Sequence, residues 1–206
     1  MLNGWFQHYR YYAPHAARIR AWVDVGPGGG APAAADHGED HRSDLLVHVR
    51  LGDFVPLGHA LSPDFYRTLL RQVPHRRAYL MTDEPGHPTV AALEAGGVTR
   101  LAPGAVETFR AARGFGTLVV GQGTFGWWLA FLSAAAARVH VGVPEHRRVG
   151  SFSVSRIADG LDLRVDEDRY TYYYRAPLAG EARAGRLVPL GNFCGAHARS
   201  AAFLWE

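Results

Sequence analysis

Residues 45–54, with the sequence LLVHVRLGDF, combine a short apolar run with polar side chains at its end. The apolar run predicts a buried strand. Because successive side chains of a strand point to opposite faces, His48 and Arg50 share one face. Gly52 permits a sharp turn, and Asp53 lies at that turn. Taken alone, the stretch fits a functional site and a buried strand followed by a polar turn equally well.

The hydrophobic pattern around this stretch alternates between strands and helices. Strands are expected at residues 45–49, 78–81, 98–101, 117–120 and 138–143, and helices at residues 63–73, 88–95, 107–113 and 125–137. This alternation predicts an α/β fold, a Rossmann-like parallel sheet with helices on both faces. Ligands of such sheets bind beyond the carboxyl ends of the strands. Polar residues follow three of the expected strands, at residues 48–53, 82–84 and 121–124.

The composition divides the chain into four segments. Residues 1–25 are expected to be an aromatic and helical segment, with its helix at residues 15–23. Residues 26–44, rich in Gly, Pro and Ala, read as a loop or linker. Residues 45–145 form the predicted Rossmann-like domain, which would bind a GDP-sugar on the resemblance described below. Residues 146–206 are a C-terminal extension of uncertain structure. Within it, SFSVSRI at residues 151–157 and RYTYYYR at residues 169–175 alternate as a strand does, and the tyrosines of 170–174 are expected to pack rather than to bind a sugar.

Several reaction classes are excluded by residue types. The 22 basic residues are all arginine, which excludes Schiff-base lysines and lysine-dependent phosphate loops. The single cysteine, Cys194, excludes an internal disulfide and a thiolate metal cluster. The histidines show no ligand spacing, so we expect no metal site. The chain begins without a secretory signal pattern, and its longest apolar run, residues 127–137, is too short to cross a bilayer.

Residues 121–132, GQGTFGWWLAFL, supply a second candidate for the ligand edge. Gly121 and Gly123 between a strand and a helix let the backbone approach a ligand closely. The N–H groups at a helix start favour an anion, and Thr124 is expected to be the N-cap, next to Phe125. With Arg50 this turn predicts a diphosphate clamp, although it matches neither a G-x-G-x-x-G fingerprint nor a P-loop.

Several segments together resemble one family, the α-1,2-fucosyltransferases of glycosyltransferase family 11. HVRLGDF at residues 48–54 resembles the family's H-x-R-x-G-D motif, and GTFGWWLAFL at residues 123–132 is similar to its second motif. NGWFQHYRYY at residues 3–12 resembles its G-Y-F-Q segment. YLMTDE at residues 79–84 lies where the family has a strand that ends in Ser-Asp. The order and spacing agree over residues 2–145.

The resemblance implies the donor-binding half of a GT-B fold. It implies an inverting enzyme that moves L-fucose from GDP-β-L-fucose to the 2-hydroxyl of a galactoside, without an essential metal or other cofactor. Carried over by position, Arg50 is the catalytic residue, which holds the β-phosphate of the leaving GDP. His48, Asp53, Asp83 and the residues at 123–125 (Gly123, Thr124 and Phe125) are expected to bind the substrate, with Asp53 holding Arg50 or shaping the turn.

The sequence also departs from the family pattern. The glycine-rich G-G-L-G-N-Q segment is not found, and Leu51 stands where a second arginine is common. A truncated or partial enzyme, a standalone donor domain and a degenerate relative are therefore all consistent with the chain.

Other function classes remain open beside the transferase. The alternatives are a non-catalytic domain that binds a sugar nucleotide or glycan, and a relic that keeps the motifs only as packing. The expected partners are GDP-fucose and a galactose-containing acceptor. Nucleic acid is not expected, because the arginines are dispersed along the chain. The family is often membrane-associated, which places a bacterial protein in the cytoplasm or at the membrane periphery and a eukaryotic one at the Golgi membrane.

Overall fold

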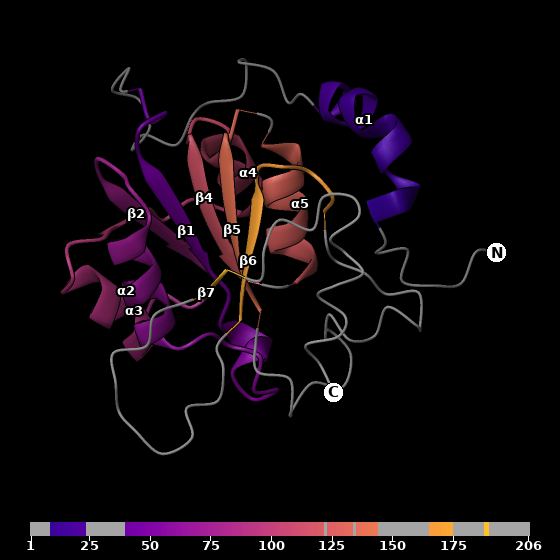
Figure 1. The fold of residues 1–206 in the computed structure, drawn as a ribbon. Coiled ribbons are helices and arrows are strands. Elements are labelled where there is room, and N and C mark those ends of the chain that lie inside the picture. The colour runs from indigo at the N-terminus through magenta and orange to yellow at the C-terminus, as the bar shows by residue number, and fades with distance from the viewer. Residues whose placement is uncertain are drawn as a thin grey trace.

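The computed structural model describes residues 9–23, 40–121, 123–133, 135–143, 165–174 and 188–189. These residues build one seven-stranded sheet with the order β3-β2-β1-β4-β5-β6-β7, of which β1 to β6 run parallel and β7 antiparallel (Figure 1). The strands are β1 Leu45–Val49, β2 Ala78–Thr82, β3 Thr99–Arg100, β4 Thr117–Gly121, β5 Arg138–Val143, β6 Tyr170–Tyr174 and β7 Val188–Pro189. The predicted parallel α/β sheet is confirmed, and the order of its first six strands is that of Rossmann-like folds.

Helices cover both faces of this sheet (Figure 1). They are α1 Ala16–Trp22, α2 Pro63–Gln72, α3 Pro88–Glu94, α4 Ala105–Ala112 and α5 Thr124–Leu132. Helices α2 and α3 pack against one face, α4 and α5 against the other, and α1 lies against α5. None of the helices in the described ranges is long and apolar enough to cross a membrane.

Strand β1 lies at the centre of the sheet and is buried on both faces. All five of its residues are buried, as expected for an inner strand of a parallel sheet. Leu45 and Val47 pack toward α2 and α3, whereas Leu46 packs toward α4 and α5. His48 falls on the second face by alternation, beneath the start of α5.

The helix predicted at residues 125–137 is shorter in the structure. Helix α5 ends at Leu132, where the Ser133 hydroxyl donates to the carbonyl oxygen of Leu129 at 2.8 Å. The Ser133 backbone then leaves the helical region, with ψ at 77°. The following alanines have high helix propensity, but this local hydrogen bond competes with helix continuation. The prediction was therefore wrong beyond residue 132.

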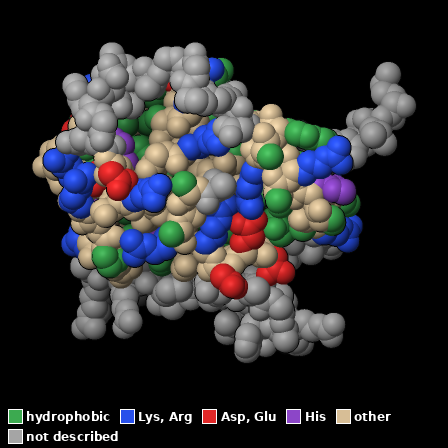
Figure 2. Space-filling view, turned by 90° about the horizontal axis from the view of Figure 1, so that it is seen from above, with side chains coloured by type: hydrophobic (Ala, Val, Ile, Leu, Met, Phe, Trp, Pro, Cys, Tyr) green, Lys and Arg blue, Asp and Glu red, His purple; other side chains and the backbone are tan. Residues whose placement is uncertain are grey.

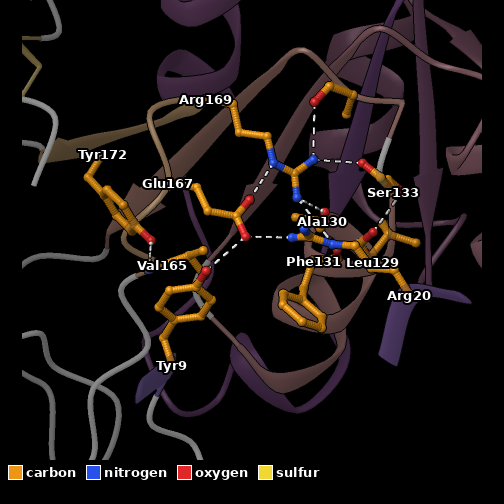
Figure 3. Close-up of polar contacts among 11 residues, drawn as sticks. Tyr9, Arg20, Leu129, Ala130, Phe131, Ser133, Val165, Glu167, Arg169 and Tyr172 are labelled. Atoms are coloured by element: carbon orange, nitrogen blue, oxygen red, sulfur yellow. Dashed lines mark hydrogen bonds and ion pairs between the residues drawn. The ribbon is translucent and has the colours of Figure 1, made fainter. Parts of the chain in front are cut away.

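A cluster of charged side chains lies at the C-terminal end of α5 and connects it to the neighbouring segments (Figure 3). The cluster consists of Arg20, Glu167 and Arg169. The Arg169 guanidinium donates to the carbonyl oxygens of Ser133 at 2.7 Å and Ala136 at 3.1 Å, and through Nε to Glu167 at 2.7 Å. Arg20 of α1 donates to the Phe131 carbonyl at 2.7 Å and to Glu167 at 2.6 Å. Cations at a helix C-terminus satisfy its unpaired carbonyls and offset the negative end of its dipole. The cluster is therefore a structural cap.

Strand β6 follows this cluster and pairs with β5 along Tyr170–Tyr174. Tyr170 and Tyr172 are buried against the α4 and α5 side of the sheet, so these tyrosines pack as expected. The first predicted stretch, residues 151–157, and Arg175 of the second lie outside the described residues, whereas Arg169 belongs to the turn that precedes β6.

Candidate functional site

A cavity opens at the point where the sheet order reverses. Strands β1 and β4 are neighbours, but the chain leaves β1 toward α2 on one face and leaves β4 toward α5 on the other. The segments that follow the carboxyl ends of β1 and β4 therefore diverge. Open α/β sheets bind ligands at such a point. The cavity measures about 480 Å³ and is lined by His48, Arg50, Phe54, Phe109, Gly121, Gly123, Thr124, Phe125, Gly126, Trp128 and Leu132.

His48 forms the floor of this cavity. Its side chain is buried beneath α5, and its ring stacks on Phe125 with centroids 5.0 Å apart and an interplanar angle of 24°. The pKa of His48 is lowered to about 4, mainly by burial; the charge of Asp83 opposes this shift, and the charge of Arg50 adds to it. The imidazole is therefore neutral at pH 7. Its buried Nδ1 lacks a hydrogen-bond partner in the described structure, and such an atom is costly unless a ligand or water satisfies it.

Arg50 lines the cavity between two carboxylates. Its Nη2 donates to Oδ1 of Asp53 at 2.5 Å, and its Nη1 donates to Oδ2 of Asp83. Asp83 also accepts the backbone N–H of Leu51 through Oδ1 at 2.9 Å. The guanidinium and the two carboxylates together carry a net charge of −1. The guanidinium of Arg50, which the sequence predicts as part of a diphosphate clamp, is therefore already engaged by two carboxylates.

The turn between β4 and α5 brings the main chain close to the other walls. A Cβ on Gly123 would meet the ring of Phe54 at 2.8 Å, and one on Gly126 would meet the carbonyl oxygen of Gly121 at 3.0 Å. A side chain at either position would therefore force its neighbour to move. The N-cap is Gly123 and not Thr124, which is the first residue of the helix, so the predicted capping role of Thr124 was wrong. The residues at the helix start, 123–126, nevertheless line the cavity, and a helix N-terminus favours an anion.

Aromatic side chains make the opposite wall. Phe125 contacts Phe109 of α4 with centroids 4.8 Å apart, and Trp128 lines the cavity one turn further along α5. Phe109 was not predicted from the sequence. Its helix, α4, follows the edge strand β3, and only the fold brings α4 against α5. Phe54 was also missed as a wall residue, although it ends the same motif as His48. Flat apolar walls of this kind accommodate a planar ring.

The structure separates the predicted site residues into two groups. His48, Arg50, Gly123, Thr124 and Phe125 all line the cavity. The two aspartates, Asp53 and Asp83, do not line it and instead hold Arg50.

The donor set within the described ranges includes no group of three or more His, Cys, Asp and Glu side chains that could hold a metal ion. The groups that line the cavity are a guanidinium, a neutral imidazole, the start of a helix and several aromatic rings.

Comparison of the chain with protein-family models, with curated proteins and with solved structures finds no match in any of the three. Function is therefore argued from the site and from the motif resemblance alone.

Proposed function

We propose that this chain is an inverting glycosyltransferase, or its donor-binding part, that moves L-fucose from GDP-β-L-fucose to the 2-hydroxyl of a galactoside. The observation that carries the proposal is the meeting of two motifs in one cavity. HVRLGD spans the end of β1, and GTFG, which starts 70 positions after Asp53, spans the N-cap and start of α5. His48, Arg50, Gly123 and Thr124 nevertheless line the same space. The described sheet would then be the donor-binding half of a GT-B fold.

In this proposal the nucleotide diphosphate binds at the switch point. Its phosphates lie between Arg50 and the start of α5, and an aromatic wall formed by Phe109, Phe125 and Trp128 receives a planar or apolar part of the donor. The acceptor hydroxyl releases its proton to solvent as its oxygen attacks the anomeric carbon opposite the diphosphate. The bond from that carbon to the phosphate oxygen breaks, and its electron pair leaves with GDP. A preorganised donor at the developing charge is worth about 3 to 4 kcal/mol of barrier, and Arg50 supplies it.

A phosphate that approaches Arg50 competes with the two carboxylates that already hold the guanidinium. A guanidinium offers five N–H donors, and at least two of them are engaged by Asp53 and Asp83. Asp53 is 60% exposed and lies on the same short turn, whereas Asp83 is 25% exposed and also holds Leu51. Asp53 is therefore the carboxylate that an incoming phosphate displaces.

Isothermal titration with GDP and with GDP-fucose tests the donor site. Arg50→Ala should weaken GDP binding by at least tenfold, the usual scale of a charge-assisted contact. Arg42→Ala, an exposed arginine outside the cavity, is the matched control and should bind as the wild type does. Equal GDP affinity in wild type and Arg50→Ala would refute the assignment of the site.

A second candidate is a binding domain without catalysis. It is favoured by one observation, that the cavity is bounded by a single sheet and its helices in the described part of the chain, whereas a GT-B active site lies between two domains. Turnover of GDP-fucose with a lactose-type acceptor separates the two candidates. Transfer to the galactose 2-hydroxyl supports the enzyme, and GDP binding without transfer supports the binding domain.

A further inference from the structure

Phe54 lies between the two motifs that meet in the candidate donor cavity. It ends the short 3₁₀-helix Gly52–Phe54 that follows β1, and it lines the cavity. The guanidinium carbon of Arg50 lies 5.5 Å from the centroid of the Phe54 ring, within the range of a cation–π contact. At the far end of the ring, a Cβ on Gly123 would lie 2.8 Å from Cζ. The same ring therefore contacts Arg50 and the main chain at the start of α5.

The turn that follows Phe54 holds its ring in place. The carbonyl oxygen of Phe54 accepts the N–H groups of His59 at 2.8 Å and of Ala60 at 3.2 Å, which closes residues 54–60 into a compact turn. The ring of His59 packs edge-on against that of Phe54, with centroids 5.8 Å apart and an interplanar angle of 75°. Both side chains are buried. A packed ring has few alternative positions, so it can act as a spacer of fixed length.

The carboxylates that hold Arg50 do not set its distance from α5. Asp53 lies on the same short turn as Arg50, and Asp83 follows the neighbouring strand β2. Both ion pairs therefore belong to the β1 and β2 side of the cavity. They fix the guanidinium relative to that side, and the spacing across the cavity needs contacts of another kind.

Two aromatic contacts cross from the β1 segment to α5. At the floor of the cavity, the ring of His48 stacks on Phe125 with centroids 5.0 Å apart. Beyond the end of β1, the ring of Phe54 abuts Gly123, the N-cap of α5. The second contact lies beside Arg50, so it is the one that bears on the distance between the guanidinium and the helix start.

Positive charge alone does not single out the candidate site. Figure 2 looks at the amino-terminal end of the strands, opposite the cavity, and shows arginine side chains spread over that face with acidic ones among them. Arg50 differs in having the start of a helix, which also favours an anion, on the other side of one cavity. A phosphate can use both groups together only if their spacing suits it.

We propose that Phe54 is a positioning residue of the donor site, whose ring sets the spacing between Arg50 and the start of α5. The inference rests on the function proposed above, since it takes a nucleoside diphosphate as the ligand of this cavity. A shorter side chain at position 54 lets the two walls relax toward the space that the ring leaves. The phosphate-binding groups are then no longer held ready, and binding must restore their spacing.

Titration of the full chain with GDP tests this role in Phe54→Leu and Phe54→Met. Leucine is shorter than the phenyl ring, whereas methionine is nearly as long but has no ring. We expect Phe54→Leu to weaken GDP binding roughly fivefold or more, because misplaced binding groups lose much of their effect. Phe54→Met should stay within about twofold of the wild type, because it keeps the length and most of the volume of the side chain.

The control is Phe115→Leu, which shortens a buried phenylalanine that does not line the cavity. It should lower the unfolding temperature and leave GDP affinity unchanged. Thermal unfolding of every variant verifies the fold. Phe54→Tyr repeats the test if Phe54→Leu is unstable. It adds an oxygen at the ring atom that abuts Gly123, pushes the walls apart, and should also weaken GDP binding.

Two results would overturn the positioning role. One is wild-type GDP affinity in Phe54→Leu, or in Phe54→Tyr where that variant replaces it. The other is an equal loss in Phe54→Leu and Phe54→Met, which would show that the ring itself contacts the ligand. Failure of the wild-type chain to bind GDP would refute the donor site and this inference with it, whereas the first two results refute only the role of Phe54.

Discussion

The Arg50 guanidinium, just beyond β1, donates through Nη1 to the carboxylate of Asp83, just beyond the neighbouring strand β2. Asp83 in turn accepts the N–H of Leu51, so one carboxylate fixes both the side chain and the main chain that follow β1. Asp53 engages the other side of the guanidinium. The candidate site therefore contains a cation that is rigidly placed and electrostatically compensated.

Removing the negative charge of Asp53 should improve anion binding. In Asp53→Asn the guanidinium keeps Asp83 but loses the carboxylate that competes with the phosphate. Two unit charges about 4 Å apart in water interact with about 1 kcal/mol, so we expect GDP affinity to rise roughly fivefold. Asp64→Asn, which alters the i,i+3 partner of Arg67 on α2, is the matched control. Weaker GDP binding in Asp53→Asn would show that Asp53 positions Arg50 and does not compete with the ligand.

Adding a methyl group at Gly52 should displace Asp83. A Cβ on Gly52 would lie 2.6 Å from Oδ2 of Asp83, whereas a Cβ on Gly86 would meet nothing within 4 Å. We expect Gly52→Ala to lower GDP affinity, because Asp83 must move and Arg50 moves with it. Gly86→Ala should bind normally in the same titration. Wild-type affinity in Gly52→Ala would contradict the positioning role of Asp83.

Stability should fall as the solution is acidified below neutral pH. Burial lowers the pKa values of His48 and His140 to about 4, so the folded chain binds fewer protons than the unfolded chain between about pH 4 and 6.5. The free energy of unfolding is highest above pH 6.5 and decreases through this window, by roughly 3 kcal/mol per histidine if each shift is fully realised. Urea unfolding at a series of pH values measures it. His48→Gln and His140→Gln should each flatten the slope, and an unchanged slope in both would rule out this origin.

The cap on α5 should be a major contributor to stability. Arg169 satisfies several carbonyl oxygens at the end of the helix and is 14% exposed. Arg169→Met leaves those carbonyls and Glu167 with fewer partners, and should cost roughly 2 to 4 kcal/mol of unfolding free energy. Arg18→Met removes an exposed arginine over the Trp22 ring, 4.2 Å from its centroid, and should cost less than about 1 kcal/mol. Equal urea midpoints for the two variants would show that the cap is not a special contributor.

Much of the fold is predictable because its strands are apolar and its helices begin with clear signals. Ser62 followed by Pro63 predicts the start of α2, and the Ser62 side chain does accept the N–H of Phe65 at 3.3 Å. The end of α5 was not predictable from helix propensity, since the hydrogen bond of Ser133 outweighs the alanines that follow it. The sequence predicts the N-cap at Thr124, one residue after its position at Gly123 in the structure. The main chain at Gly123 lies close to the ring of Phe54, a contact between distant segments that the local pattern does not show.

The alternation of buried strands and helices can be read from the residues in order, and it predicts a parallel sheet whose strands end in the motifs at residues 48–53 and 121–124. Those properties depend on periodicity and on residue type along the chain. The folded arrangement places Arg50 between Asp53 and Asp83 and brings Phe109 to the cavity wall. It also brings Arg67, Arg71 and Arg77 to one groove at the far edge of the sheet. Each of these depends on distances between segments that separate elements bring together, and local pattern carries no information about such distances. For Arg50, the sequence predicts a guanidinium at the ligand edge, and the fold determines which carboxylates a phosphate must replace to reach it.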